Sequence, residues 1–204
     1  MKITNMILDG FQEFDSEHSL VLFCHGCNFK CDYCYNYDTV TDKNNIIGEA
    51  KTLIDGNINP MHTAVVLLGG EPTIYGDELI DIAKHIKSKG LKVKLFTNLS
   101  NPGLVIDLIE RGLLDSISMD VKWSKNPTKS TIGGIIDYVE HMDRWLHEVS
   151  MTGIDSEVRI TLNAETERSD AVAMKQKYGY IVNRVIIQEN FNKFIKEDKQ
   201  DVNS

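Results

Sequence analysis

The sequence of 204 residues lacks a membrane-spanning run, an excess of positive charge and internal repeats. No apolar run approaches the roughly 20 residues needed to cross a bilayer. The chain has 22 Lys and Arg against 30 Asp and Glu, a net charge of −8. This balance disfavours nucleic acid as the main partner, because phosphate binding needs basic patches. The composition, 42% hydrophobic and 25% charged, is typical of an ordinary globular protein with one sizeable core.

Cysteines are also few, and no export signal precedes them. The segment Met1–Asn5 lacks the apolar stretch of a signal peptide. Disulfides are therefore not expected, and we predict a reducing, cytoplasmic location. We expect one domain over residues 1–195, with a core at about 20–188. Residues 196–204 are expected to form a polar tail that frays.

All four cysteines lie in one short segment near the N-terminus. Cys27, Cys31 and Cys34 form a C-x3-C-x2-C triplet, with Tyr33 before the last cysteine. Thiolates at this density are a ligand set for an iron–sulfur cluster, zinc or copper(I). A triplet is one thiolate short of the four that close a cubane cluster. One iron therefore stays open to an outside ligand, which points to an enzyme.

Structural zinc is the main alternative for these cysteines. Zinc ribbons separate their two C-x2-C knuckles by about 15–20 residues, whereas only Asn28, Phe29 and Lys30 lie between Cys27 and Cys31. The spacing therefore favours an iron–sulfur cluster. Cys24 ends an apolar run, and we expect it to pack as a small hydrophobe or to lie beside the cluster as a bystander thiol.

Strand and helix patterns alternate along the rest of the chain. Unalternating apolar runs predict buried parallel strands, and apolar residues at three- and four-residue steps predict helices. The six strands are expected at residues 20–23, 64–68, 92–97, 115–121, 157–162 and 181–188, with helices near 48–55, 79–90, 101–112, 132–149 and 170–178. This order specifies an α/β fold with a parallel sheet and right-handed crossovers, either an open doubly wound sheet or an incomplete (β/α) barrel. In both, function collects at the carboxyl ends of the strands.

Polar residues gather at those predicted strand ends. They are Gly69, Gly70, Glu71, Asn98, Asp120, Lys122 and Arg159. Charged side chains that face inward need partners, and a charged or zwitterionic cofactor supplies them. Each feature also has a plainer interpretation. The glycines form an ordinary βα turn, Asn98 is a turn former, and the charges pair with each other at frayed strand ends.

The triplet after the first strand and Gly69-Gly70-Glu71 after the second resemble the radical S-adenosylmethionine (SAM) superfamily. The resemblance implies a partial (β/α)6 barrel, with a [4Fe–4S] cluster held by Cys27, Cys31 and Cys34 and SAM chelating the open iron. It places Tyr33 near the adenine and Gly69, Gly70 and Glu71 at the methionyl amino group. It implies contacts to ribose or carboxylate from Asn98, Asp120, Lys122 and Arg159.

Within the superfamily, the string from Gly26 to Asn36 looks most like glycyl-radical-enzyme activases, above all the activating protein of anaerobic ribonucleotide reductase. Asp9-Gly10 and Met119-Asp120-Val121-Lys122 are similar to elements of that subgroup, whereas Tyr35 stands where it commonly has His. The resemblance implies reductive cleavage of SAM and a glycyl radical formed on a partner enzyme. It also implies a flavodoxin- or ferredoxin-like electron donor.

Two other functions remain open from the sequence. One is a radical SAM enzyme for a small molecule, similar to 7-carboxy-7-deazaguanine synthase, although no substrate-holding extension is evident. The other is a non-catalytic zinc or iron–sulfur scaffold. A scaffold leaves unexplained why Glu71, Asp120 and Arg159 are expected at the same edge as the cysteines.

Overall fold

The computed structural model describes residues 1–31, 33–121, 136–162 and 168–188. Its centre is an eight-stranded sheet in the order β3-β1-β2-β4-β5-β6-β7-β8. The strands are β1 Lys2–Gly10, β2 Ser19–Cys24, β3 Gly48–Glu49, β4 Ala64–Gly69, β5 Lys92–Thr97, β6 Ser116–Val121, β7 Asp155–Thr161 and β8 Arg184–Gln188. From β2 through β8 each neighbouring pair in this order is parallel. The predicted parallel α/β sheet with six units is confirmed.

Helices alternate with these parallel strands, and the periodicity predicts five of them but not the short helix Tyr37–Thr41. The helices are α1 Tyr37–Thr41, α2 Ala50–Asn57, α3 Asp77–Ser88, α4 Pro102–Glu110, α5 Ile136–Ser150 and α6 Arg168–Tyr178, with 3-10 turns η1 Lys43–Asn45 and η2 Pro72–Tyr75. Gly90 has φ +77°, the left-handed conformation expected after a helix end. Within the described ranges no helix is both long and apolar enough to span a membrane. The predicted tail at 196–204 lies outside the described residues.

Two strands were not predicted from the sequence. β1 pairs antiparallel with β2, and the short β3 pairs antiparallel with the start of β1. The apolar residues of β1 do not alternate, because Met6, Ile7 and Leu8 are consecutive, so the strand carries no period-two signal. Ile7 and Leu8 remain 38% and 45% exposed. The parallel sheet is thus extended by an antiparallel edge.

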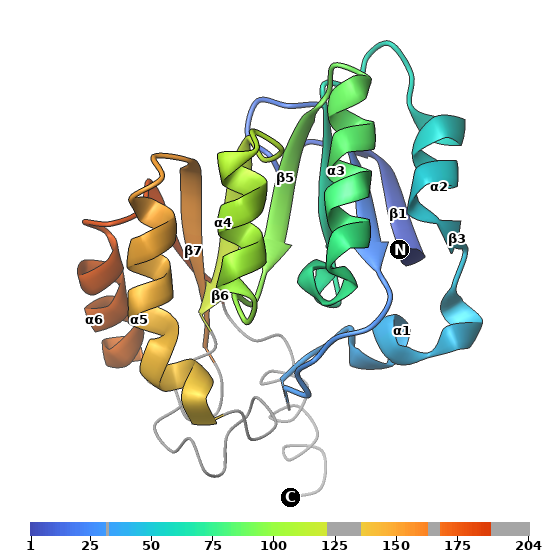
Figure 1. The fold of residues 1–204 in the computed structure, drawn as a ribbon. Coiled ribbons are helices and arrows are strands. Elements are labelled where there is room, and N and C mark those ends of the chain that lie inside the picture. The colour runs from blue at the N-terminus through green and yellow to red at the C-terminus, as the bar shows by residue number, and fades with distance from the viewer. Residues whose placement is uncertain (32, 122–135, 163–167, 189–204) are drawn as a thin grey trace, which may run out of the picture.

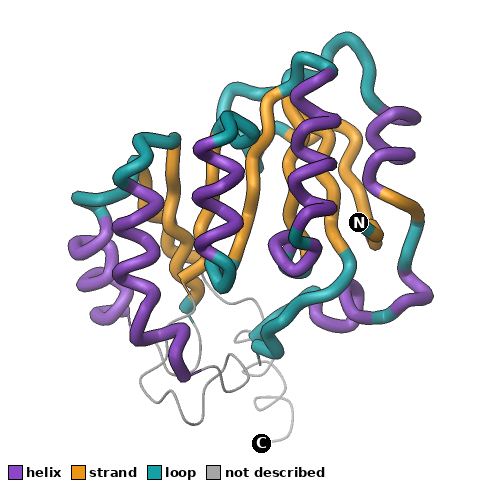
Figure 2. The backbone as a smooth tube through the Cα atoms, in the orientation of Figure 1, coloured by secondary structure: helices purple, strands orange, loops and turns teal. Residues whose placement is uncertain are grey.

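Helices α2 to α6 lie on one face of the sheet (Figures 1 and 2). That face carries alternate strand residues such as Leu22, Leu67 and Leu95, which pack with helical residues such as Ile82 and Leu108 in the main hydrophobic core. The helices therefore bury one side of the sheet and leave the other side as the inner surface of the partial barrel.

The inner surface divides into an apolar part and a charged part. Toward β2 and β4 it holds a second apolar cluster that includes Phe14, Val66 and Phe96. Further along, Lys94 and Glu157 are 1% and 4% exposed, and Lys94 Nζ lies 3.3 Å from Glu157 Oε2. Burial lowers the pKa of Lys94, and the Glu157 carboxylate opposes this effect. A buried ion pair thus occupies the interior of the partial barrel.

Candidate active site at the carboxyl edge of the sheet

The candidate residues lie at one edge of the sheet. The cysteine loop follows β2, the Gly69–Glu71 turn ends β4, and Asn98 directly follows β5. Figure 1 shows the loop between β2 and α1 at the edge toward which the arrowhead of β5 points. The structure thus brings together segments that are far apart in the sequence. Lys122, a further predicted contact, follows the last residue of β6 in the sequence and lies outside the described residues.

Cys24 differs from the other three cysteines in its surroundings. It is fully buried in the main core, whereas Cys27, Cys31 and Cys34 are partly exposed, and none of the four forms a disulfide. Burial raises the pKa of the Cys24 thiol, and the nearby Glu71 carboxylate raises it further. Cys24 is therefore a packed, protonated thiol, as the apolar run before it predicts.

The other three cysteines are not arranged around a single ion. Among the described residues, the only group of three His, Cys, Asp or Glu whose ligand atoms all lie within 4.8 Å of one another is elsewhere. Two sulfurs on one zinc are at most about 4.6 Å apart, twice the Zn–S distance. The Cys27 sulfur accepts a hydrogen bond from the Phe29 backbone N–H at 3.4 Å, the kind of contact that tunes cluster thiolates. The three partly exposed thiols are soft donors of the kind that an iron–sulfur cluster takes.

The glycine turn after β4 is interlocked with the start of the cysteine loop. Gly70 N–H donates to Cys24 O at 3.0 Å, and Glu71 N–H donates to Gly26 O at 2.8 Å. Gly69 has φ +109°, which side chains rarely tolerate, and a Cβ atom on it would lie 2.6 Å from Cys24 N. Glycine is therefore required by the backbone here. The turn is more than an ordinary βα connection, because it sets the position of the loop that carries the cysteines.

The Glu71 side chain faces into the protein. It is 1% exposed, and its carboxylate accepts four hydrogen bonds. The donors are Thr73 N–H at 3.1 Å, Thr73 Oγ1 at 2.5 Å, Thr97 Oγ1 at 2.7 Å and Asn98 N–H at 2.6 Å. Burial raises the pKa of the Glu71 carboxyl, and these hydrogen bonds oppose the rise. The carboxylate joins the end of β4 to the end of β5.

Asn98 joins a further hydrogen-bond network that the sequence did not reveal. Its side chain donates to Asn28 Oδ1 at 3.0 Å, and Asn28 donates to Ser100 Oγ at 2.8 Å. The available signal was a polar residue inside the cysteine string, Asn28, and a polar run after β5. Neither signal identifies its partner, because the pairs are about 70 residues apart in the chain.

Asp120 and Arg159 are neighbours across β6 and β7. The Arg159 guanidinium lies over the Phe96 ring, 5.0 Å from its centroid. Its buried Nε has no hydrogen-bond partner among the described residues, although Glu157 Oε1 lies 3.8 Å away. A buried Arg159 Nε–H without a hydrogen bond is suited to donate to an anionic ligand group at the mouth of the barrel. Tyr33, in the cysteine loop, is 8% exposed.

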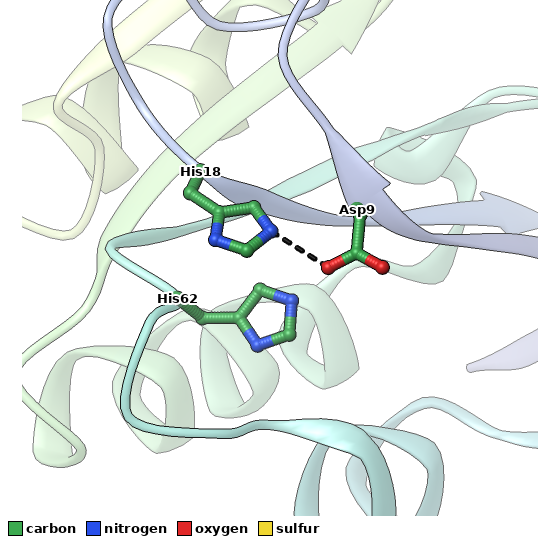
Figure 3. Close-up of side chains that lie close together, drawn as sticks. All are labelled: Asp9, His18 and His62. Carbon is green, nitrogen blue, oxygen red and sulfur yellow. Dashed lines mark hydrogen bonds and ion pairs between the residues drawn. The ribbon is translucent and has the colours of Figure 1, made fainter.

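A second polar cluster lies near the opposite ends of the strands. Asp9, His18 and His62 place their ligand atoms within 4.8 Å of one another (Figure 3). His62 Nδ1 accepts from the Asn59 N–H at 3.1 Å, and Nε2 lies 2.6 Å from Leu8 O. A backbone N–H only donates, so the proton of a neutral His62 is on Nε2 and is given to Leu8. Both ring nitrogens are then committed, which argues against a metal centre.

Comparison with known proteins identifies the family. The family model of the Radical SAM superfamily matches residues 21–162. The chain belongs to the radical SAM superfamily. Two Methanocaldococcus jannaschii proteins named glycyl-radical enzyme activating enzymes are similar to it. One is 36% identical over 111 residues, 54% of this chain and 45% of the relative; the other is 30% identical over 104 residues, 50% of this chain and 39% of the relative. The matched segment thus spans less than half of each relative.

Solved structures agree on the radical SAM fold. Streptococcus suis SuiB bound to S-adenosylmethionine covers 83% of this chain and 40% of its own, with a TM-score of 0.59 and 13% identity. The same protein bound to its precursor peptide SuiA gives a TM-score of 0.60 at 14% identity, over 83% of this chain and 38% of its own. At this identity the likeness concerns the fold alone, and it confirms the predicted partial barrel.

Proposed function

We propose that the protein is a radical SAM enzyme that cleaves SAM reductively and generates a glycyl radical on a partner protein, an anaerobic ribonucleoside-triphosphate reductase. The carrying observation is the interlock between the cysteine loop and the Gly69–Glu71 turn, through Gly70 N–H to Cys24 O and Glu71 N–H to Gly26 O. It joins the loop that carries the thiolate ligand set to a turn whose glycines pack directly against that loop. Both features are needed if one ligand is to bridge the metal and the protein.

Cys27, Cys31 and Cys34 would hold the [4Fe–4S] cluster, which when bound supplies the electron that splits the S–C5′ bond of SAM. The Gly69–Glu71 backbone is proposed to receive the methionyl amino group. Arg159, whose Nε makes no hydrogen bond among the described residues, is suited to the SAM carboxylate by a charge-assisted hydrogen bond. Tyr33 is proposed to lie near the adenine, and Asp120 and Lys122 near the ribose.

The substrate class is supported by the relatives rather than by a pocket. Proteins named glycyl-radical enzyme activating enzymes match about half of this chain, and a structural neighbour has been captured with a peptide. The described sheet has six parallel strands, and we propose that a glycine loop of the partner enters at the side of this partial barrel. A flavodoxin- or ferredoxin-like protein is the proposed electron donor.

Anaerobic reconstitution tests the proposal in two stages. The first expects about four irons and four sulfides per chain, together with 5′-deoxyadenosine when SAM and a reductant are added. The second adds the partner reductase and expects the doublet of a glycyl radical by electron paramagnetic resonance. Replacement of Cys27, Cys31 or Cys34 by Ala is expected to abolish both results.

The first stage tests radical SAM chemistry, and the second tests the activation of a partner enzyme. Stoichiometric zinc without 5′-deoxyadenosine would contradict radical chemistry altogether. Turnover of SAM together with a small metabolite, without a partner and without a persistent radical, would keep the SAM chemistry and overturn the activase assignment.

A further inference from the structure

Asn98 has its polar atoms committed to other parts of the protein. Its backbone N–H donates to Glu71 Oε2 at 2.6 Å and its Nδ2 donates to Asn28 Oδ1 at 3.0 Å, while its Oδ1 accepts from the Ser100 N–H at 2.9 Å. The residue is 5% exposed. An amide that is buried and bonded on both its oxygen and its nitrogen is poorly placed to bind a ligand directly.

The partner of Asn98 lies next to the first cysteine of the triplet. Asn28 follows Cys27, and its side chain is tied by both ends to the segment after β5. Its oxygen accepts from Asn98, and its nitrogen donates to Ser100 Oγ at 2.8 Å. Because Asn28 is exposed, packing does not hold it in this position. These two hydrogen bonds therefore fix the near end of the cysteine loop against β5.

The backbone between Asn98 and Ser100 adopts an unfavourable conformation to make this contact. Leu99 has φ +58°, in the left-handed region that leucine rarely enters. Its N–H donates to Thr97 Oγ1 at 3.0 Å, and the Thr97 hydroxyl donates to Glu71 at 2.7 Å. The left-handed residue turns the chain back so that Asn98 and Ser100 both face Asn28. Such strain persists only where the surroundings over-determine it, and it clusters at functional sites.

We propose that Asn98 is a positioning residue. Its side chain holds the cysteine loop through Asn28, and its backbone N–H holds the Gly69–Glu71 turn through Glu71, so that the loop and the turn keep a fixed relative position. This inference rests on the proposed function, because it concerns the two halves of one SAM site. The cysteine loop would hold the cluster, and the turn would receive the methionyl group. A bidentate ligand that bridges them is sensitive to displacements of about 1 Å.

A double-variant cycle distinguishes positioning from direct contact. Asn28→Ala, Asn98→Ala and the double variant are compared with wild type for iron and sulfide content, for SAM affinity and for the reduction potential of the cluster without SAM. Iron content should stay unchanged. Each single variant should weaken SAM affinity by about three- to tenfold, and the double variant no further, because both changes break one network. Both single variants should shift the potential in the same direction.

Asn101→Ala is the matched control. Asn101 is also an asparagine of this segment, but its side chain accepts from Leu104 N–H at the start of α4, where it caps the helix. This variant should leave SAM affinity and the potential as in wild type. Loss of SAM affinity in Asn98→Ala but not in Asn28→Ala would show direct contact and overturn the proposal. Unchanged affinity and potential in both would overturn it as well.

Failure of the proposed function gives a different result. If wild type holds its cluster but neither binds nor cleaves SAM, the function is wrong, while matching potential shifts in Asn28→Ala and Asn98→Ala still support the positioning role. If wild type holds no cluster, the cycle is measured on the midpoint of urea unfolding. Non-additive shifts of the two single variants then support the coupling between the loop and β5, and additive shifts overturn it.

Discussion

Gly70 and Gly26 approach so closely that a Cβ atom on Gly70 would lie 1.8 Å from the Gly26 carbonyl oxygen. This contact joins the turn after β4 to the residue before the first cysteine of the triplet. No side chain can be accommodated without moving backbone, and the backbone on both sides is hydrogen-bonded. The proximity of the two glycines therefore determines how the cysteine loop sits on the sheet.

Gly70→Ala should displace the cysteine loop and lower both iron content and SAM affinity. A real Cβ essentially never lies within 3.0 Å of another heavy atom, so Gly26 must move. The measurements are iron analysis after reconstitution and the midpoint of urea unfolding. Gly103→Ala, in α4 with nothing within 4 Å of the new Cβ, is the control. It should be neutral or stabilising by about 0.5–1 kcal/mol. Normal iron content in Gly70→Ala would contradict the interlock.

The sequence predicted the parallel strands well because their signal is local. Runs such as 64–68 are apolar throughout and lie between turn residues, so one segment of chain contains the whole pattern. The antiparallel β1 was missed because its stability comes from pairing with β2 and not from an alternation of its own. The contact between β1 and β2 is a tertiary property, and the residues 2–10 alone do not encode it.

The sequence predicted which residues lie at the candidate site, but not the hydrogen bonds that connect them. The spacing of the cysteines and of the glycine turn is visible in the chain, and both were expected at the carboxyl edge. The roles of Glu71 and Asn98 were not visible, because the hydrogen-bond partners of their side chains come from other segments. Thr97 satisfies Glu71, and Asn28 satisfies Asn98. A side chain that looks available in the sequence is engaged in the folded protein.

Glu71→Gln should destabilise the protein, because the carboxylate is surrounded by donors. Gln replaces one acceptor oxygen with an NH2 group that faces Asn98 N–H or the Thr73 and Thr97 donors. We expect the free energy of unfolding to fall by about 1–3 kcal/mol. Glu110→Gln, at the exposed end of α4, should change it by less than about 0.5 kcal/mol. Equal unfolding curves for the two variants would show that the Glu71 network contributes little.

Cys24 should make stability fall at alkaline pH. Burial raises the pKa of Cys24 above the ordinary value of 9.0, so the folded protein keeps a proton that the unfolded chain releases. The contribution is fully present below pH 9 and is lost as the pH rises toward the folded value. Relative to Cys24→Val, wild type should lose up to about 1.4 kcal/mol per pH unit above 9. Urea unfolding at pH 8 and pH 10 measures the difference, and parallel pH profiles would place Cys24 in contact with water.

The Asp9, His18 and His62 cluster should act as a structural clip and should bind no stoichiometric zinc. His62 connects the segment before β4 to β1, through Asn59 N–H to Nδ1 and through Nε2–H to Leu8 O. His18 lies between the rings of Phe11 and His62, 4.6 Å and 4.7 Å from their centroids, and pairs with Asp9. His62→Ala removes two hydrogen bonds to partly exposed backbone groups, which should cost about 0.5–1.5 kcal/mol of unfolding free energy.

A zinc titration distinguishes a structural role of the Asp9, His18 and His62 cluster from a metal-binding role. With the cysteines blocked by alkylation, calorimetric titration with zinc should show no binding at this cluster, and His62→Ala should behave as wild type. His85→Ala is a control for a surface histidine, since His85 pairs with Asp55 on exposed helices. One zinc per chain that is lost in both His18→Ala and His62→Ala would contradict the structural role, because the metal would take the Nδ1 lone pair that accepts from the Asn59 N–H.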